Sequence, residues 1–189
     1  MNLALQFIYL IISSSVSYCI FINKYLYLCV YTVCCFCILD YILHVLKINK
    51  LKRDMILHHN FVLCNILFIH NHLYPVTYNI NDANIIIRNV LSTEISTIFL
   101  ILNNLIKHDK LKIINNINQV FFVSSFIYYR IYNYWIYIII SKETNLFIIN
   151  VSKNNFHLIY MYIGIYGLFA INIFWLTRIF NKIYNLITN

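Results

Sequence analysis

The 189-residue chain is poor in glycine, proline and charge. It contains two glycines and one proline, and only 11% of its residues are charged. A soluble domain carries about 25% charged residues, because its surface must face water, and it uses more glycine and proline in its turns. With 61% hydrophobic residues and a mean hydropathy of +0.71, the composition instead indicates a membrane protein.

Two further protein classes are excluded by the residues that are present. A disordered chain has few large apolar side chains, whereas this chain has 14 Phe and 17 Tyr in addition to many Ile and Leu. A disulfide-stapled secreted domain places its cysteines in polar loops. The six cysteines of this chain lie in apolar runs, where thiols act as small apolar side chains.

Six apolar segments are long enough to cross a bilayer, which takes about 20 residues in a helix. Lipid offers no partner to an unpaired backbone group, and the alternating pattern of a β-barrel is absent, so helices are expected. The first segment lacks a basic start and a small-residue cleavage site, and is expected to be a span rather than a signal peptide. The sequence predicts an all-α, multi-pass transmembrane helical bundle with a single domain over residues 1–189. The expected spans are 3–22, 25–46, 55–74, 85–106, 113–140 and 156–177.

Lysine and arginine are concentrated in alternate connections between these spans. By the positive-inside rule, the richer connections face the cytosol, so both termini are expected there. This topology accounts for most of the net charge of +8, and no basic helix or stacked-aromatic motif predicts a nucleic-acid partner. The residues expected on the cytosolic side are Lys47, Lys50, Lys52, Arg53, Lys107, Lys110, Lys112, Arg178 and Lys182, against Lys24, Lys142 and Lys153 on the other side.

Ionisable residues inside the expected spans are the first candidates for function. Each costs roughly 2.5 kcal/mol or more in hydrocarbon, so those that persist usually face the bundle interior and have partners. The residues in this position are Asp40, His58, His59, Glu94 and Arg130.

Asp40 and the histidine pair are expected to meet. The second and third spans are antiparallel neighbours, which places Asp40 and His58 at a similar depth. An Asp there can fix the imidazole tautomer and raise its basicity, as a general base or nucleophile requires. Because adjacent helical residues point about 100° apart, only one of His58 and His59 can face this partner squarely. A structural role, in which these groups only satisfy one another, is an equal alternative.

Arg130 and Glu94 are predicted to form a structural ion pair, because an unpaired arginine at that depth is very costly. A metal site is not predicted. His70 and His72 lie about 17 Å along the helix axis from the pair formed by His58 and His59, so the four cannot share one ion.

The order of these motifs resembles the TLC-domain family of multi-pass membrane proteins. This family includes the translocating-chain-associating proteins, the ceramide synthases and the smaller TLC-domain-containing proteins, and the chain is most similar to the last group. The resemblance covers residues 40–175. The matching pieces are Asp40, Ile56 to His59, Leu91 to Leu100, Asn118 with Phe126, Tyr129 to Ile131, and Asn172 to Trp175.

The chain also departs from the family patterns. Ceramide synthases carry Asp-x-x-Asp and then Phe-Leu-Glu after the histidines, but Glu94, Thr97 and Ile101 stand at the three acidic positions here, so two acids are missing. The small subgroup usually has Pro, Asn and Arg-Trp after its Glu-x-Ser stretch. Ile98, Ile101 and Asn103 with Asn104 replace them in this chain.

The resemblance implies helices around a lipid-accessible cavity, and a function in lipid handling or membrane lipid homeostasis, related to sphingolipids or phospholipids. It also implies the endoplasmic reticulum or another secretory membrane, with membrane lipids as partners and no cofactor. Glu94, Arg130, Asn172 and Trp175 are expected in the cavity or in a structural polar network.

Two alternatives stay open. The first is a ceramide-synthase-like N-acyltransferase that uses acyl-CoA and a long-chain base, with His58, His59 and Asp40 as its catalytic residues. The second is a membrane cargo escort or translocation-associated factor, although the short loops offer little recognition surface.

Overall fold

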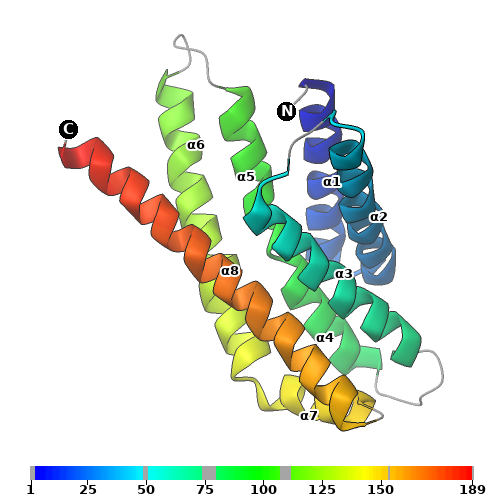
Figure 1. Cartoon of the computed structure of the whole chain (residues 1–189). Helices are drawn as coiled ribbons and strands as arrows, with labels where there is room; N and C mark the ends of the chain where they lie inside the picture. The colour runs from blue at the N-terminus through cyan, green and yellow to red at the C-terminus, as the bar shows by residue number, and fades with distance from the viewer. Residues whose placement is uncertain (1–2, 49–50, 74–79, 107–111, 153, 189) are drawn as a thin grey trace.

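The structure is a computed structural model that describes residues 3–48, 51–73, 80–106, 112–152 and 154–188 (Figure 1). The described residues are almost entirely helical and include no strand, which confirms the predicted all-α class. The elements are α1 (Leu3–Ile22), α2 (Leu26–Val45), α3 (Arg53–Leu73), α4 (Ile80–Leu91), α5 (Glu94–Leu105), α6 (Lys112–Ser125), the π-helices η2 (Phe126–Asn133) and η3 (Trp135–Ile139), α7 (Lys142–Val151) and α8 (Asn155–Thr188).

Every expected span coincides with helical structure. Helices α4 and α5 together form the fourth span, and α6 with η2 and η3 forms the fifth. Within the described residues, four segments are long and apolar enough to cross a membrane: Leu5–Ile22, Leu26–Val45, Asn84–Leu105 and Asn155–Asn185. They correspond to the first, second, fourth and sixth expected spans. The fold is therefore that of a multi-pass membrane protein with four candidate spans, and the larger count of six is not established by helix length and hydropathy.

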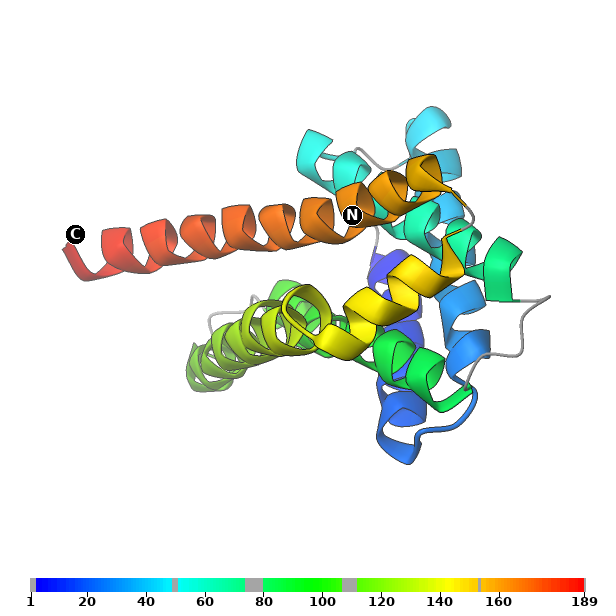
Figure 2. The same ribbon diagram turned by 90° about the horizontal axis from the view of Figure 1, so that it is seen from below.

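The helices run up and down beside one another. Helix α5 packs beside both α1 and α6, and α3 packs against α8. The N- and C-termini both lie toward the upper end of Figure 1, together with the end of α2 and the start of α6. Seen from below, the C-terminal part of α8 extends away from the other helices (Figure 2). Lys50, Lys107 and Lys110 of the predicted cytosolic set lie outside the described residues.

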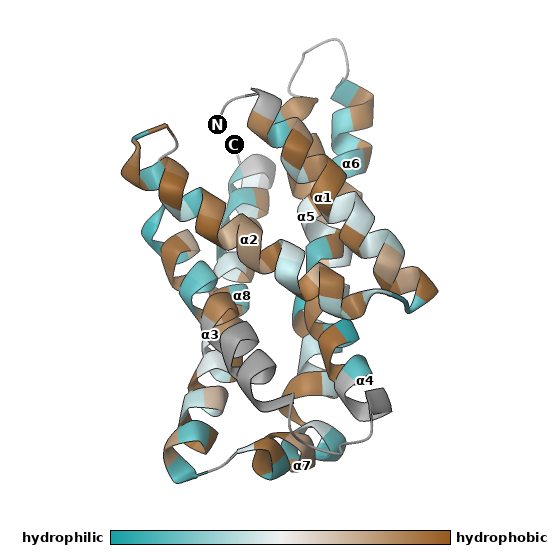
Figure 3. Cartoon of the chain, turned by 90° about the vertical axis from the view of Figure 1, so that its right-hand side faces the viewer, coloured by the Kyte–Doolittle hydropathy of each residue, from teal (hydrophilic) through white to brown (hydrophobic). Residues whose placement is uncertain are grey.

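Two apolar clusters hold the lower part of the bundle together. One joins α4, η3, α7 and α8 around Tyr134 and Ile138, each only 1% exposed. The other joins α1, α2 and α4 around Val16 and Cys29. Many large apolar side chains face outward, and hydrophobic residues predominate along α1 and α2 in Figure 3. An apolar exterior of this extent fits a protein surrounded by lipid.

A break between α4 and α5 interrupts the fourth span at Ser92 and Thr93. The hydroxyl of Ser92 donates to the carbonyl of Asn89 (2.7 Å), and that of Thr93 donates to the carbonyl of Val90 (2.8 Å). Hydroxyls that bond back to the preceding turn compete with backbone bonding and bend helices. The break lies directly before Glu94, so it sets the direction in which the first turn of α5 faces the bundle.

The fifth span changes from an α-helix to the wider turns of a π-helix at Phe126. The buried side chains of η2 and of the residue directly after it are Phe126, Arg130, Asn133 and Tyr134. Asn133 donates to Asn89 Oδ1 (3.1 Å) and to Ser92 Oγ (3.0 Å), which ties η2 to the α4–α5 break. Wide π-turns occur often at functional sites, and this one carries Arg130.

Helix α7 is a short connection between η3 and α8. Ser141 caps its start, because its hydroxyl accepts from the backbone N–H of Thr144 (3.2 Å). The same hydroxyl donates to Glu143 (2.9 Å). Hydrogen bonds from its own backbone N–H and from Ser141 lower the pKa of Glu143, so the carboxylate stays charged beside the positive end of the helix dipole.

Candidate functional site

A polar cluster runs through the middle of the bundle from α1 to α8. Its members come from six elements, which are α1, α2, α3, α5, η2 and α8. We define the polar cluster as Tyr9, Asp40, Asp54, His58, His59, Ser96, Thr97, Arg130, Asn172, Trp175 and Arg178.

Asp40 occupies one end of the polar cluster. Its Oδ1 accepts a hydrogen bond from the hydroxyl of Tyr9, and its Oδ2 lies 3.6 Å from Nε2 of His59. Asp40 is 5% exposed and His59 is 6% exposed, so this contact is shielded. The prediction that Asp40 faces His58 is therefore wrong. The depth was predicted correctly, but the rotation of α3 turns the next residue, His59, toward α2.

His58 points instead toward α8. Its ring lies 5.1 Å from that of Trp175, between ring centroids, and 5.9 Å from the ring of His59. The two histidines thus face different helices, as the 100° rotation per residue predicts. In both rings the Nδ1 atom is buried and has no hydrogen-bond partner. A buried polar atom without a partner is costly, and in a native protein it calls for an explanation.

Arg130 lies at the centre of the polar cluster and is only 6% exposed. Its Nε donates to Ser96 Oγ (2.7 Å), Nη1 donates to Asn172 Oδ1 (3.3 Å), and Nη2 donates to Thr97 Oγ1 (2.9 Å). Three elements, η2, α5 and α8, therefore meet at one guanidinium. Asn172, which is one of these acceptors, is 2% exposed.

The predicted ion pair between Arg130 and Glu94 is not formed. The ion pairs between side chains of the described residues are His59 with Asp40 and Arg178 with Asp54. Glu94 is half-buried in the first turn of α5 and acts on Arg130 only from beyond contact distance. Ser96 and Thr97 of α5 contact the guanidinium instead.

Two aromatic rings flank the guanidinium of Arg130. Its Cζ lies 5.5 Å from the ring centroid of Phe126 and 5.5 Å from that of Trp175. At this distance the negative ring faces attract a cation. Trp175 therefore touches both Arg130 and His58, and it links the two halves of the polar cluster.

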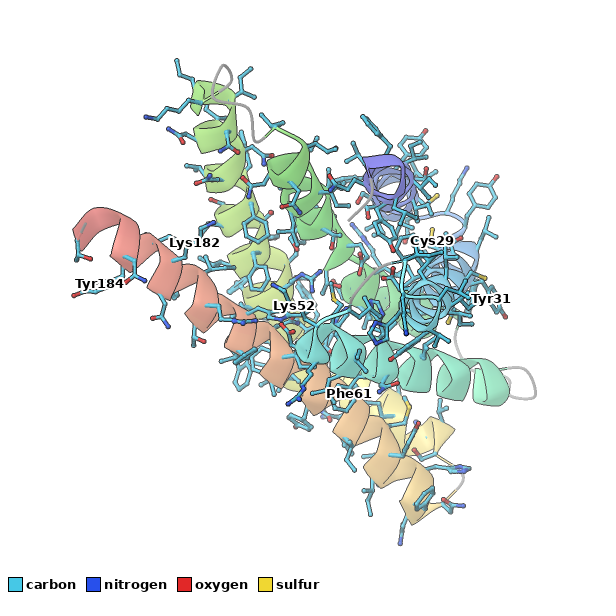
Figure 4. All side chains as sticks on the ribbon, turned by 45° about the horizontal axis from the view of Figure 1, so that its top comes forward. Cys29, Tyr31, Lys52, Phe61, Lys182 and Tyr184 are labelled. Atoms are coloured by element: carbon cyan, nitrogen blue, oxygen red, sulfur yellow. The ribbon has the colours of Figure 1, made fainter. Side chains whose placement is uncertain are left out.

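Asp54 lies at the other end of the polar cluster. Its Oδ2 accepts from Nε1 of Trp175 (2.8 Å) and from Nη1 of Arg178 (3.0 Å). Both partners belong to α8. Figure 4 shows the first half of α3, marked by Lys52 and Phe61, lying against the middle of α8. Asp54 thus fixes the start of α3 on α8 and holds His58 next to Trp175.

Sequence reasoning missed five members of the site, which are Tyr9, Asp54, Ser96, Thr97 and Arg178. Asp54 lies four residues before His58, so the two share one face of α3, and this spacing was a usable signal. Tyr9 gave no such signal, because it is one of 17 tyrosines. Its role depends on how α1 packs against α2.

Chemically, the polar cluster offers proton transfer and hydrogen bonding. Asp40 and His59 form a carboxylate–imidazole pair suited to acid–base chemistry. Within the part of the chain that the structure describes, no group of three or more His, Cys, Asp or Glu side chains is placed to hold a metal ion. The side chains of His70 and His72 lie outside the described residues.

Comparison of the chain with protein-family models, curated proteins and solved structures finds no match. The resemblance to the TLC-domain family stays a prediction from the motifs.

Proposed function

We propose that the chain is a multi-pass membrane protein that handles membrane lipids and influences sphingolipid or phospholipid composition. The observation that carries this proposal is the pair of buried histidines, His58 and His59, each with an unpartnered Nδ1 between Asp40 and Arg130. A purely structural network would satisfy its own polar atoms, since lipid cannot. Two unsatisfied nitrogens in the polar cluster are open to a polar group that arrives from outside, and in a membrane that group is a lipid headgroup.

The proposed localisation follows from the same features. A secretory-pathway membrane such as the endoplasmic reticulum fits a lipid-handling role. The positive-inside rule places the end of α2, the start of α3 and the end of α8 on the cytosolic side. The polar cluster includes Asp54 and Arg178 at that side, so a headgroup would reach it from the cytosolic leaflet.

The second candidate is an N-acyltransferase that uses acyl-CoA and a long-chain base. The contact of Asp40 with Nε2 of His59 favours it, because a proton held on Nε2 leaves the lone pair on Nδ1. In that reaction the amine nitrogen bonds to the thioester carbonyl carbon while the C–S bond breaks toward sulfur. The Nδ1 of His59 would take the amine proton and return it to the leaving thiolate.

One experiment separates these functions. Membranes containing the intact chain or a His58→Ala/His59→Ala variant are matched for protein level and given labelled long-chain base and acyl-CoA. Their lipids are then compared by mass spectrometry. The control is His157→Ala, which removes a histidine of α8 that does not belong to the polar cluster.

We expect the intact chain and the His157→Ala control to share one altered lipid profile, and the double variant to lose it. Labelled ceramide that depends on both histidines would select the acyltransferase. An identical lipid profile for all three proteins would contradict lipid handling and favour a cargo escort, which would then co-purify with protein cargo.

A further inference from the structure

We propose that the polar cluster binds the acidic headgroup of a membrane lipid, a phosphate or a carboxylate, through Arg130. This inference rests on the proposed lipid-handling function and names the class of headgroup. Its basis is the charge balance around a single buried side chain.

The guanidinium of Arg130 is buried without an anionic partner. All three of its hydrogen-bond acceptors, on Ser96, Thr97 and Asn172, are neutral. Of the nearby described acids, Asp40 pairs with His59 and Asp54 with Arg178, and Glu94 acts on Arg130 only from beyond contact distance. An isolated charge in a membrane interior is among the most costly arrangements a protein can hold. An anion bound from outside would remove this cost.

The hydrogen bonds of Arg130 leave donors unused for such an anion. A guanidinium has five N–H donors, and three are used by the bonds to Ser96, Thr97 and Asn172. One N–H on each terminal nitrogen is therefore left. Two parallel donors of this kind match two oxygens of a carboxylate or phosphate, the arrangement for which arginine is preferred over lysine.

His58 supplies a further group next to Arg130. Both side chains pack on the ring of Trp175, with His58 at 5.1 Å between ring centroids and the Arg130 Cζ at 5.5 Å from the centroid. The Nδ1 of His58 is buried and has no partner. A neutral imidazole with its proton on this atom donates to a remaining oxygen of the same anion. One acidic group would thus satisfy both the unpaired charge and the unpaired nitrogen.

Glu94 is the rival source of negative charge, since it lies nearby but out of contact. If Glu94 swings onto Arg130 in the membrane, the guanidinium is already neutralised and acidic lipids gain no advantage. If the anion comes from a lipid, removing Glu94 leaves the preference for acidic lipids intact.

The test is native mass spectrometry of the full chain released from neutral detergent micelles with four added probes. Palmitic acid is compared with hexadecanol, and dipalmitoyl phosphatidic acid with dipalmitoylglycerol. Within each pair the chains match and only the acidic group differs. The variants are Arg130→Lys, Arg130→Met and Glu94→Gln, and the control is Arg88→Gln, which removes an exposed guanidinium of α4 that lies outside the polar cluster.

We expect the intact chain to prefer the acidic member of at least one pair by about tenfold or more, the range that hydrogen bonds to charged groups provide. The pair that shows the preference identifies carboxylate or phosphate as the source. Arg130→Met should lose the preference and Arg130→Lys should weaken it, whereas Arg88→Gln and Glu94→Gln should keep it.

Two outcomes would overturn the inference in distinguishable ways. Equal binding of acidic and neutral probes by the intact chain would refute the role of Arg130 as an anion receptor while leaving lipid handling in place. Binding of none of the four probes would contradict the lipid-handling proposal as well. Because both comparisons use the unaltered protein, they hold even if an Arg130 variant fails to fold.

Discussion

At the scale of single residues, Asp54 is the point at which α3 and α8 are joined. It accepts one hydrogen bond from the indole of Trp175 and one from the guanidinium of Arg178. The two bonds differ in environment, because the Arg178 side chain is 55% exposed whereas that of Asp54 is 19% exposed. Their contributions to stability should therefore differ.

We predict that Asp54→Ala destabilises the protein by about 1–3 kcal/mol, because the indole N–H of Trp175 loses its acceptor. Arg178→Gln should cost about 1 kcal/mol or less, since exposed ion pairs contribute little. Thermal unfolding in detergent micelles, followed by tryptophan fluorescence, measures both. Equal losses from the two variants would show that the ion pair, rather than the indole bond, holds the helices together.

Gly167 of α8 lies against the ring of Phe61 of α3. A Cβ placed on Gly167 would lie 2.6 Å from Cζ of Phe61 and 2.8 Å from both of its Cε atoms, so the ring stands end-on over the glycine. We expect Gly167→Ala to destabilise the protein by about 1–3 kcal/mol through overpacking.

The matched test of this contact is the same substitution in a Phe61→Leu background. There the shorter side chain leaves room, and alanine should be neutral or slightly stabilising because it favours helix over glycine. Thermal unfolding of the unaltered chain, the two single variants and the double variant gives the coupling free energy between positions 61 and 167. If Gly167→Ala changes the unfolding temperature equally in both backgrounds, the ring of Phe61 does not contact Gly167.

The sequence identified most members of the polar cluster but not their pairing. Charged and polar residues inside apolar runs are conspicuous, which is why Asp40, His58, His59 and Arg130 were predicted. Pairing depends on how each helix is rotated about its axis, and one residue changes that rotation by about 100°. The contacts of Asp40 with His59, and of Arg130 with Ser96 in place of Glu94, could not be read from position alone.

At the scale of elements, α1 and α2 form a helical hairpin. Cysteines on the two helices allow the packing of this hairpin to be tested by cross-linking. Cys29 of α2 belongs to the apolar cluster of α1, α2 and α4, and Cys19 of α1 packs against the same cluster. Each lies a few residues from the connection between the two helices. Cys35 of α2 is exposed on the outside instead.

We predict that copper–phenanthroline with oxygen joins Cys19 and Cys29 in an intramolecular disulfide, with oxygen as the electron acceptor. Alkylation with a mass-tagged maleimide before and after reduction would count the thiols that are consumed. Cys29→Ser should abolish this cross-link and Cys35→Ser should leave it intact. A cross-link that survives Cys29→Ser would mean that α1 and α2 meet along different faces.

Helix positions were easier to predict than helix irregularities. Long apolar runs predicted all six helical regions, because lipid forces the backbone to satisfy its own hydrogen bonds. The break at Ser92 and Thr93 and the π-turns from Phe126 onward left no comparable pattern. They depend on side-chain bonds such as that of Asn133 to Ser92, which exist only after the helices have packed.

At the scale of the whole molecule, the number of spans decides on which side of the membrane each connection between helices lies. Four segments satisfy the length and hydropathy of a span among the described residues, whereas six helical regions run up and down the bundle. Four or six crossings both leave the termini on the same side. They differ in the side on which the start of α6 lies.

We predict that Lys112 at the start of α6 lies on the same side as Lys47 at the end of α2, and that Lys142 at the start of α7 lies on the opposite side. Protease-cleavable tags inserted at these three positions, tested in sealed microsomes, would show which are accessible from outside. Six crossings give cleavage at Lys47 and Lys112 alone. Cleavage at Lys47 alone would support four crossings, with α3 and α6 failing to traverse the bilayer.

Helix α8 makes the molecule sensitive to the thickness of its surroundings. Its apolar part is 31 residues long, or about 46 Å at 1.5 Å per residue, against a hydrocarbon core of about 30 Å. Such a helix must lie steeply inclined or thicken the lipid around it, and a thinner bilayer would force a greater inclination. Because Trp175 of α8 contacts both His58 and Arg130, a change in the inclination of α8 would move these contacts. Hydrophobic mismatch would therefore change the geometry of the polar cluster.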